Sequence, residues 1–154
     1  MTNSIMNISV IGGHKCSPKH KKIAYELGRL IASEGWVLVS GGREGVMEAA
    51  CRGARSAGGL TVGLMPSMDG ADANKYVDIV IPTGLGYARN ILVTRAAQYI
   101  VAIAGHVGTL SEIAFAFNDE KKVFGIDTWD IPGVIKVKTP YEAVRRIKKQ
   151  QSRC

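Results

Sequence analysis

Two glycine bends carry the residues whose types and spacing could bind an anion. The stretch 99–112, YIVAIAGHVGTLSE, begins as a short apolar run with strand character, breaks at Gly105 and Gly108, and continues with a helical pattern from Thr109. At such a junction of a strand with a helix, backbone N–H groups and the helix dipole can face an anion. A second bend, residues 40–45, follows another apolar run. We therefore predict a site for a phosphorylated, nucleotide-like ligand at these bends.

Other nucleotide-binding and catalytic motifs are missing from the sequence. The first glycine bend reads GGHKCS rather than G-x-G-x-x-G, and the second strand ends in Ser40 rather than in an acid that would hold a ribose hydroxyl, which argues against an NAD enzyme. The sequence contains neither a G-x-x-x-x-G-K-[ST] loop nor a G-x-S-x-G nucleophile elbow. His14, Cys16 and His20 match no zinc spacing and lack a fourth ligand, so we expect no metal site and no required cofactor.

Strands and helices that alternate along the chain must position these bends. The hydrophobic pattern predicts strands at about residues 7–12, 36–40, 60–65, 77–81, 122–126 and 134–137, and a further strand that begins at residue 99. It predicts helices at about residues 18–34, 46–57, 83–98 and 139–150, and a further helix that begins at residue 109. This alternation predicts an α/β protein with a mostly parallel, doubly wound sheet of about six to seven strands, covered on both faces by right-handed crossovers. Ligands of such sheets bind beyond the carboxyl ends of the strands.

Taken together, the bends resemble the motifs of a known family. Residues 40–48 (SGGREGVME), 88–90 (ARN) and 104–112 (AGHVGTLSE) are similar to the GGG-x-x-G-hydrophobic-Met bend, the Arg-Lys pair and the P-G-G-x-G-T-x-x-E loop of the Lonely Guy family, which comprises cytokinin-activating nucleoside-monophosphate phosphoribohydrolases. The chain looks closer still to a small branch of that superfamily that includes molybdenum-cofactor carrier proteins. The resemblance covers roughly residues 8–127. It implies a single-domain modified Rossmann fold over residues 1–154, ending in a basic helix at about 139–150.

The resemblance also implies roles for individual residues. Gly105, Gly108 and Thr109 would grip a phosphate through backbone and hydroxyl donors, and the second bend would line the same cleft. The full set of predicted phosphate- or nucleotide-binding residues is Gly12, Gly13, Ser17, Gly41, Gly42, Arg43, Gly45, Arg89, Gly105, His106, Gly108 and Thr109. In the enzymes of the family, the residues that match Arg89 and Glu112 act in N-glycosidic cleavage. A carboxylate can stabilise an oxocarbenium-like ribose or activate water, and an arginine can hold a phosphate.

Three departures separate this chain from the family motif. Ala104 replaces the proline, His106 replaces the second glycine, and Asn90 replaces the lysine after the arginine. We expect the loss of proline to relax the bend, His106 to bring a bulky, titratable side chain close to the ligand, and Asn90 to remove a positive charge. We therefore predict a binding or carrier protein for a nucleoside monophosphate or a phosphorylated pterin-type cofactor. The alternative is a nucleoside 5′-monophosphate phosphoribohydrolase that releases base and ribose 5-phosphate.

Several of these residues also have a purely structural explanation. Thr109 and Glu112 have the spacing of a capping box, in which the threonine caps the N3 amide and the glutamate returns to the N-cap amide. Glu48 could be a first-turn acid beside a helix dipole rather than a catalyst. Arg89 could pair with a surface carboxylate, and His106 could face either a ligand or solvent.

Length and cysteine content bound the class of protein. At 154 residues, 46% of them hydrophobic, the chain fits one compact domain without disulfides. Cys16, Cys51 and Cys154 are an odd number at unrelated spacings, so we expect free thiols in a reducing compartment. No stretch approaches the roughly 18 apolar residues of a membrane span, and residues 1–13 make a poor signal peptide. We therefore expect a cytoplasmic protein without a membrane partner.

The net charge of +7 is concentrated at one end of the chain. Residues 136–154 contain seven basic side chains and one acidic side chain, a balance of +6, so the remaining 13 basic and 12 acidic side chains carry only +1. We interpret the tail as a solvated terminal helix, because basic residues are favoured at a helix C-terminus. The alternative, a nucleic-acid patch, lacks interleaved aromatic residues, so nucleic acid is not expected as a partner.

Family habit leads us to expect a homodimer or a higher homo-oligomer. The apolar residues 91–93, together with Ala96 and Ala97, could form its surface. The same residues could equally pack on the sheet.

Overall fold

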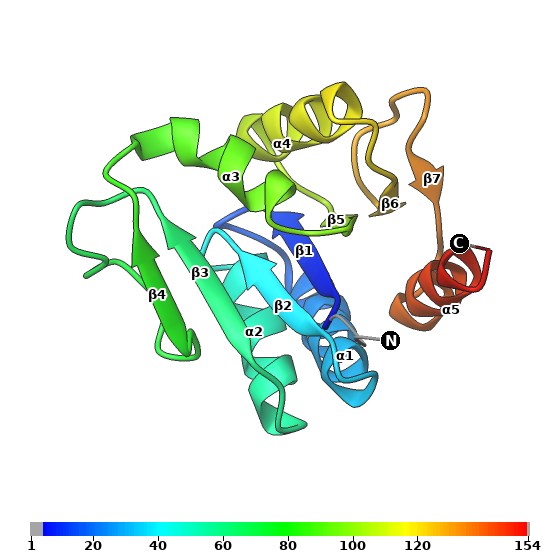
Figure 1. Ribbon diagram of the computed structural model, residues 1–154, viewed down its shortest axis with the longest axis horizontal. Helices are drawn as coiled ribbons and strands as arrows, with labels where there is room; N and C mark the ends of the chain where they lie inside the picture. Colours follow the sequence, from blue (N-terminus) through cyan, green and yellow to red (C-terminus); the bar gives the residue numbers. More distant parts are fainter. Residues whose placement is uncertain (1–4, 154) are drawn as a thin grey trace.

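A parallel seven-stranded sheet forms the centre of the computed structural model, which describes residues 5–153 (Figure 1). Its strands lie in the order β4-β3-β2-β1-β5-β6-β7, and every neighbouring pair is parallel. The strands are β1 (Asn7–Gly12), β2 (Val37–Ser40), β3 (Thr61–Met65), β4 (Ile79–Pro82), β5 (Tyr99–Ile103), β6 (Val123–Ile126) and β7 (Ile135–Lys136). The predicted α/β class with a parallel sheet is confirmed.

Helices cover both faces of the sheet. Within residues 5–153 they are α1 (Pro18–Ser33), α2 (Val46–Ser56), the 3₁₀-helix η1 (Gly86–Arg89), α3 (Asn90–Arg95), α4 (Val107–Asn118) and α5 (Pro140–Gln151). One hydrophobic cluster joins α1, α2 and α5 to the sheet, and a second joins α3 and α4 to the opposite face (Figure 1). On β1, Val10 belongs to the first cluster and Ile11 to the second. Because both faces of the central strands are buried, their sequences read as continuous apolar runs.

The chain reverses its direction across the sheet between β1 and β5. From β1 the sheet is built through β2 and β3 to β4, whereas β5, β6 and β7 follow on the other side of β1. A crevice forms at such a switch point beyond the carboxyl ends of the strands. Here the loops that leave β1 and β5 lie beside one another, because Gly12 is in register with Ile103.

Between residues 77 and 98, two elements differ from the sequence prediction. Instead of one helix over residues 83–98, the structure has η1 followed by the short helix α3, which ends at Arg95. Lys121 Nζ donates hydrogen bonds to the carbonyl oxygens of Thr94, Arg95 and Ala97 at 2.8, 2.9 and 2.7 Å. These carbonyl groups at the end of α3 therefore have a hydrogen-bond partner although the helix does not continue. Strand β4 begins at residue 79 rather than 77, and all four of its residues are exposed, so the prediction that the sheet is covered on both faces does not hold at this edge.

The residues proposed from sequence as an oligomer surface are largely occupied within the chain. Val93 is fully buried, and Ala97 is 3% exposed. Leu92 and Ala96 are partly buried and pack against the cluster under α3 and α4. Of the two uses that the sequence left open for this run, the structure shows packing on the sheet.

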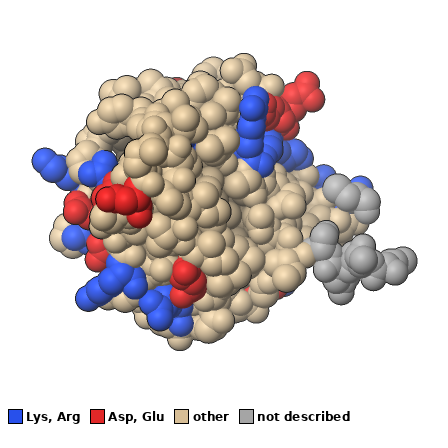
Figure 2. Space-filling view, turned by 60° about the vertical axis from the view of Figure 1, so that its left-hand side comes forward, with Lys and Arg blue, Asp and Glu red and all other residues tan. Residues whose placement is uncertain are grey.

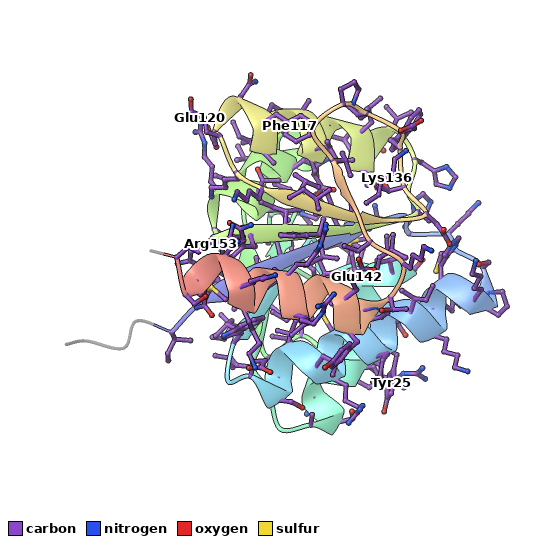
Figure 3. All side chains as sticks on the ribbon, turned by 90° about the vertical axis from the view of Figure 1, so that its right-hand side faces the viewer. Tyr25, Phe117, Glu120, Lys136, Glu142 and Arg153 are labelled. Carbon is purple, nitrogen blue, oxygen red and sulfur yellow. The ribbon has the colours of Figure 1, made fainter. Side chains whose placement is uncertain are left out.

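The basic C-terminal helix lies at the end of the sheet opposite to β4, beside α1 (Figure 3). Thr139 is its N-cap and accepts a hydrogen bond from the amide of Glu142 at 3.1 Å, while the Glu142 carboxylate accepts one from the amide of Lys138 at 2.8 Å. Within residues 5–153, no helix has both the length and the apolar character needed to cross a membrane. Cys16 and Cys51 are free thiols, and Cys154 lies outside the described residues.

Candidate functional site

A small cavity opens at the switch point of the sheet. Its volume is about 90 Å³. Its lining comes from the end of β1 and the loop that follows, from the loop after β2 and the start of α2, from η1 and the start of α3, and from the start of α4. The lining residues are Gly12, Gly13, His14, Arg43, Met47, Tyr87, Arg89, Asn90, His106, Gly108, Thr109 and Glu112. The structure thus gathers both glycine bends and the two residues matched to catalytic positions around one space.

Eight of the residues singled out from sequence line this cavity: Gly12, Gly13, Arg43, Arg89, His106, Gly108, Thr109 and Glu112. Five others do not: Ser17, Gly41, Gly42, Gly45 and Gly105. These five residues lie outside the cavity wall, where they either shape the loops that form the site or stabilise a neighbouring element.

Gly45 and Gly105 allow the loops to approach one another. Gly45 has φ +69°, and a Cβ at this position would lie 2.3 Å from the carbonyl oxygen of Gly13. Gly105 has φ +108°, and its Cβ would lie 2.3 Å from Oγ1 of Thr109. Any side chain at either position would therefore be strained and would push the bends apart.

The remaining three residues have local roles. The carbonyl oxygen of Gly41 accepts a hydrogen bond from Arg89 Nη2 at 3.3 Å, so this glycine positions a lining side chain. The amide of Gly42 donates a hydrogen bond to Oγ of Ser40 at 3.1 Å, which fixes this part of the bend. Ser17 is the N-cap of α1, and its Oγ accepts from the amide of His20 at 3.2 Å.

Helix α4 begins two residues earlier than the sequence indicated. Its N-cap is His106, and Val107 is its first residue, so Thr109 lies inside the first turn. The proposed capping box of Thr109 and Glu112 is therefore wrong, because neither residue stands in the position that such a box requires. In the described part of the chain, no side chain caps this helix. Its first amides have no acceptor within the helix and face the cavity end of the sheet.

Thr109 supplies a further donor that has no protein partner. The residue is 2% exposed, and within the described part of the chain its Oγ1 makes no hydrogen bond. A buried hydroxyl without a partner costs roughly 1–3 kcal/mol. Because this hydroxyl borders the cavity at the start of α4, a ligand oxygen would supply the missing partner.

Arg89 is a buried arginine at the cavity wall. It is 7% exposed, and its guanidinium donates to the carbonyl oxygen of Gly41 and to Oδ1 of Asn90. Its Nε has no partner among residues 5–153. Burial lowers the pKa of Arg89, the nearby Glu112 raises it, and Arg43 lowers it again. Among residues 5–153, Arg89 forms no salt bridge with a surface carboxylate, so this alternative is not observed.

Glu112 lies on α4 with its carboxyl group at the cavity. The residue is 6% exposed, and burial raises the pKa of its carboxyl from 4.5 to about 8, against the opposing effect of Arg89. The carboxyl group is therefore mostly protonated at neutral pH. In this form it can donate a hydrogen bond to a ligand or a proton to a leaving group, whereas general-base action would require a higher pH.

The bend before α4 is not relaxed by its alanine. Ala104 has φ +46°, in the left-handed region, and its amide donates to the carbonyl oxygen of Ile126 at 3.0 Å. Its own carbonyl accepts from Oγ1 of Thr128 at 2.6 Å. A proline, whose φ is fixed near −65°, could not adopt this conformation. Alanine at the family's proline position is therefore held in a left-handed conformation that a proline could not adopt.

Four lining residues were not proposed as ligand contacts from the sequence: His14, Met47, Tyr87 and Asn90. Met47 occupies the methionine position of the bend motif, which could have identified it. Asn90 connects two walls of the site, because its side chain accepts a hydrogen bond from Arg89 and donates one to Oγ of Ser111 at 3.2 Å. No comparable signal marks Tyr87, which is 85% exposed.

The remaining candidates lie outside the cavity. Glu48 is an acid in the first turn of α2 and does not line it. Within residues 5–153, no three His, Cys, Asp or Glu side chains gather so that they could hold a metal ion. The cavity thus combines cationic groups, free helix amides and a neutral carboxylic acid, which is a combination suited to an anion attached to a polar group.

Comparison with known proteins gives a family match over nearly the whole chain. The model of the SLOG cluster4 family matches residues 5–153. The cytokinin riboside 5′-monophosphate phosphoribohydrolase of Mycobacterium tuberculosis is 33% identical over 127 residues, which cover 73% of this chain and 67% of the relative.

Two solved structures are similar in both fold and sequence. The molybdenum cofactor binding protein of the phototrophic bacterium Rippkaea orientalis superposes with a TM-score of 0.91 at 38% identity, covering 96% of this chain and 98% of that one. The molybdenum cofactor carrier protein of Chlamydomonas reinhardtii superposes with a TM-score of 0.87 at 32% identity, covering 97% and 99%.

Proposed function

The chain belongs to the SLOG cluster4 family, and on this basis we propose that it binds a phosphorylated pterin-type or nucleotide-like cofactor in the cavity at the start of α4 and serves as its carrier. The proposal takes its ligand class from the two molybdenum cofactor proteins that resemble this chain over almost their full lengths. The similarity to a phosphoribohydrolase is compatible with the same phosphate grip.

The observation that carries the proposal is a set of buried polar atoms without protein partners. Thr109 Oγ1 and Arg89 Nε have none among the described residues, and both side chains border the cavity beside the amides at the start of α4. Unpaired donors at a helix N-terminus are arranged to receive the oxygens of one anion. A phosphate in the cavity would offer several oxygen acceptors and a negative charge to these donors.

The size of the cavity indicates which part of the ligand it would enclose. Its volume of about 90 Å³ is smaller than the roughly 300–1,000 Å³ of pockets that enclose a whole small molecule. We therefore assign the phosphate to the cavity and the heterocycle to its open mouth. There the exposed ring of Tyr87 offers a stacking surface, and the neutral Glu112 offers a hydrogen-bond donor.

The residues that line the cavity are suited to hold the phosphate of a pterin cofactor rather than to coordinate its metal. The cavity lining contains no carboxylate other than Glu112 and no thiol. A bound molybdenum cofactor would bring its own metal chemistry, and the chain would hold and orient the phosphate through Thr109, Arg89 and the helix amides.

Thermal shift with matched ligands tests this proposal. The panel contains adenosine and guanosine 5′-monophosphates and a phosphorylated molybdopterin-type pterin, each beside its dephosphorylated form, together with inorganic phosphate. At about 100 times its Kd, a ligand adds roughly 2.7 kcal/mol to the free energy of unfolding. We expect this gain for a phosphorylated member only. Absence of stabilisation by every phosphorylated ligand would contradict the proposal.

A matched pair of arginine variants locates the binding. Arg89→Gln removes the buried cation of the cavity, whereas Arg52→Gln removes an exposed arginine that does not line it. We expect the first variant to lose the ligand-dependent shift and the second to retain it, with both folded by circular dichroism. Equal shifts in the two variants would place the ligand elsewhere.

A second candidate function is N-glycosidic cleavage of a nucleoside 5′-monophosphate, favoured by Arg89 and Glu112 at one cavity wall and by the enzyme relative. In that case the protonated Glu112 would transfer its proton to the leaving base while Arg89 holds the phosphate. Release of free base that disappears in Glu112→Gln would establish this function. Binding without base release, unchanged in that variant, is expected of a carrier.

A further inference from the structure

Another cavity lies between α5 and the strands β6 and β7. Its volume of about 320 Å³ is at the lower end of the roughly 300–1,000 Å³ of ligand pockets. Four cationic side chains surround it: Arg145, Arg146, Lys149 and Arg153. The rest of its lining is Gln150 of α5, Phe124 of β6 and Ile135 of β7. We call this cavity the α5 groove, and it shares no lining residue with the cavity at the start of α4.

The packing of α5 places its cations at this groove. Ala143, Val144 and Ile147 are buried and attach one side of the helix to the core (Figure 3). Residues four positions apart lie on the same face of a helix. Arg145 and Lys149 therefore follow one another along an exposed side of α5, and Arg153 lines the groove from the turn after the helix.

Acidic side chains do not neutralise this cluster. Among residues 5–153, Arg145, Lys149 and Arg153 form no ion pair. Arg146 reaches Glu142 only at 4.0 Å. Since like charges four positions apart in a helix repel one another, Arg145 and Lys149 oppose the formation of α5.

The helix dipole explains only part of the basic charge. It favours Lys148 and Lys149, which lie in the last turn of α5. Arg145 and Arg146 lie before that turn, where the effect of the dipole has fallen off. Lys122 adds a further cation beside the groove, because its Nζ donates a hydrogen bond to Oε1 of Gln150. A solvated terminal helix therefore does not account for the gathering of these side chains.

Charges on the rest of the molecule are mixed in sign. The part of the chain before residue 136 carries 13 basic and 12 acidic side chains. On the β4 side of the molecule, basic and acidic groups lie close to one another (Figure 2). Arg55, for example, pairs with Asp78 at 3.4 Å. The α5 groove thus concentrates positive charge that its own chain leaves uncompensated, which is the electrostatic condition for attracting a polyanion.

The lining of the groove distinguishes between kinds of polyanion. Single-stranded nucleic acids stack their bases on exposed aromatic rings, but Phe124, the aromatic residue of the lining, is fully buried. A single small anion is best held by fixed donors such as the amides of a helix N-terminus, whereas this groove offers long side chains of the second half of α5. Such side chains suit several anionic groups carried by one chain.

A polypeptide with spaced carboxylates meets these requirements. The guanidinium fork of an arginine matches a carboxylate in two parallel hydrogen bonds. Arg145 and Lys149 are separated by about 6 Å along the helix axis, and alternate residues of an extended peptide repeat about every 6.8 Å. Ile135 and the aliphatic stems of the arginines offer apolar surface to the residues between the acids.

We propose that the α5 groove binds an acidic segment of another protein, an extended stretch in which Asp or Glu alternates with small apolar residues. The carboxylates of this segment pair with Arg145, Lys149 and Arg153. Opposite charge steers the partner to the groove and accelerates its association. The proposal does not depend on which ligand the cavity at the start of α4 binds.

Fluorescence anisotropy with labelled probes tests this surface. The probe is a peptide of about twelve residues in which glutamate alternates with alanine, and its control has glutamine in place of every glutamate. A single-stranded oligothymidylate of the same length is the nucleic-acid probe. In low salt we expect the wild-type chain to bind the glutamate peptide at least about tenfold more tightly than either of the other two. This binding should weaken as salt is added.

Two double variants that remove the same charge locate the binding. Arg145→Gln/Lys149→Gln removes two cations of the groove, whereas Arg52→Gln/Lys75→Gln removes an exposed arginine and an exposed lysine that do not line it. We expect the first variant to bind the glutamate peptide at least about tenfold more weakly than wild type, and the second to bind it within about twofold of wild type. The first variant should also unfold at no lower temperature than wild type, because it removes a repulsion.

Each contrary result would overturn the proposal. Absence of binding, or equal binding of the glutamate and glutamine peptides, would show that the groove does not recognise carboxylates. Tighter binding of the oligothymidylate would assign it to nucleic acid instead. Equal weakening in the two double variants would show that net charge alone attracts the peptide. A lower unfolding temperature of Arg145→Gln/Lys149→Gln would show that these cations stabilise the fold.

Discussion

Replacement of Glu112 by glutamine should stabilise the protein in a pH-dependent way. Burial raises the pKa of the Glu112 carboxyl from 4.5 to about 8 in the folded chain. The unfolded chain therefore loses this proton at lower pH than the folded chain. Between these two values the unfolded state binds fewer protons, so the contribution of Glu112 to stability falls as the pH rises. Glutamine has nearly the same shape and stays neutral throughout.

The expected size follows from the shift. One pKa unit corresponds to about 1.4 kcal/mol, so Glu112 lowers the free energy of unfolding by roughly 1 kcal/mol at pH 5 and roughly 3 kcal/mol at pH 7. The advantage of Glu112→Gln over wild type should therefore grow by about 2 kcal/mol between these pH values. For a chain of this length that is a difference in Tm of roughly 4–8 °C.

The assay is thermal unfolding of the ligand-free protein, followed by circular dichroism from about pH 5 to pH 8, the window that the pKa shift defines. Glu44→Gln, which removes an exposed carboxylate from a neighbouring bend, controls for the loss of one negative charge. A constant offset between Glu112→Gln and wild type could arise from altered hydrogen bonding alone. A Tm difference that does not grow with pH would refute the assignment of Glu112 as a neutral buried acid.

Three further predictions test the bends. Thr109→Val should raise the free energy of unfolding by about 1 kcal/mol, because it removes an unpaired buried hydroxyl, yet weaken phosphorylated ligands roughly tenfold by calorimetry. Ala104→Pro restores the family motif but should lower the free energy of unfolding by roughly 3 kcal/mol or more in denaturant titrations, since proline cannot adopt φ +46° or donate to Ile126. Gly45→Ala should lower the free energy of unfolding by more than about 2 kcal/mol, because its Cβ would meet the backbone of the loop after β1. Gly58→Ala, at a similar φ of +75° with open space around it, should lower it by only about 1 kcal/mol. Equal losses in the two variants would contradict the close approach at Gly45.

The sequence predicted the sheet well because its signal is local. Strand β1 has the predicted bounds, and α2 begins at the predicted Val46. The gathering of distant bends around one cavity also followed, since parallel strands bring their carboxyl ends to one edge. Arg89 and Glu112, more than 20 positions apart, meet there for this reason.

The errors have causes that the hydrophobic pattern and the residue spacing do not contain. The start of α4 is set by the extended backbone of His106 rather than by a capping side chain, so the threonine-to-glutamate spacing was misleading. The early end of α3 depends on Lys121, which reaches it from beyond α4. Hydrophobic periodicity also does not distinguish an edge strand from a central strand, so the exposure of β4 could not be predicted.

The most direct test of ligand binding is native mass spectrometry of wild type and Arg89→Gln after incubation with a phosphorylated molybdopterin-type pterin and, separately, with its dephosphorylated form. We expect wild type to retain one phosphorylated ligand per chain and little of the dephosphorylated one, and Arg89→Gln to retain neither. Equal retention of the two forms by wild type, or undiminished retention by Arg89→Gln, would contradict a phosphate site in this cavity.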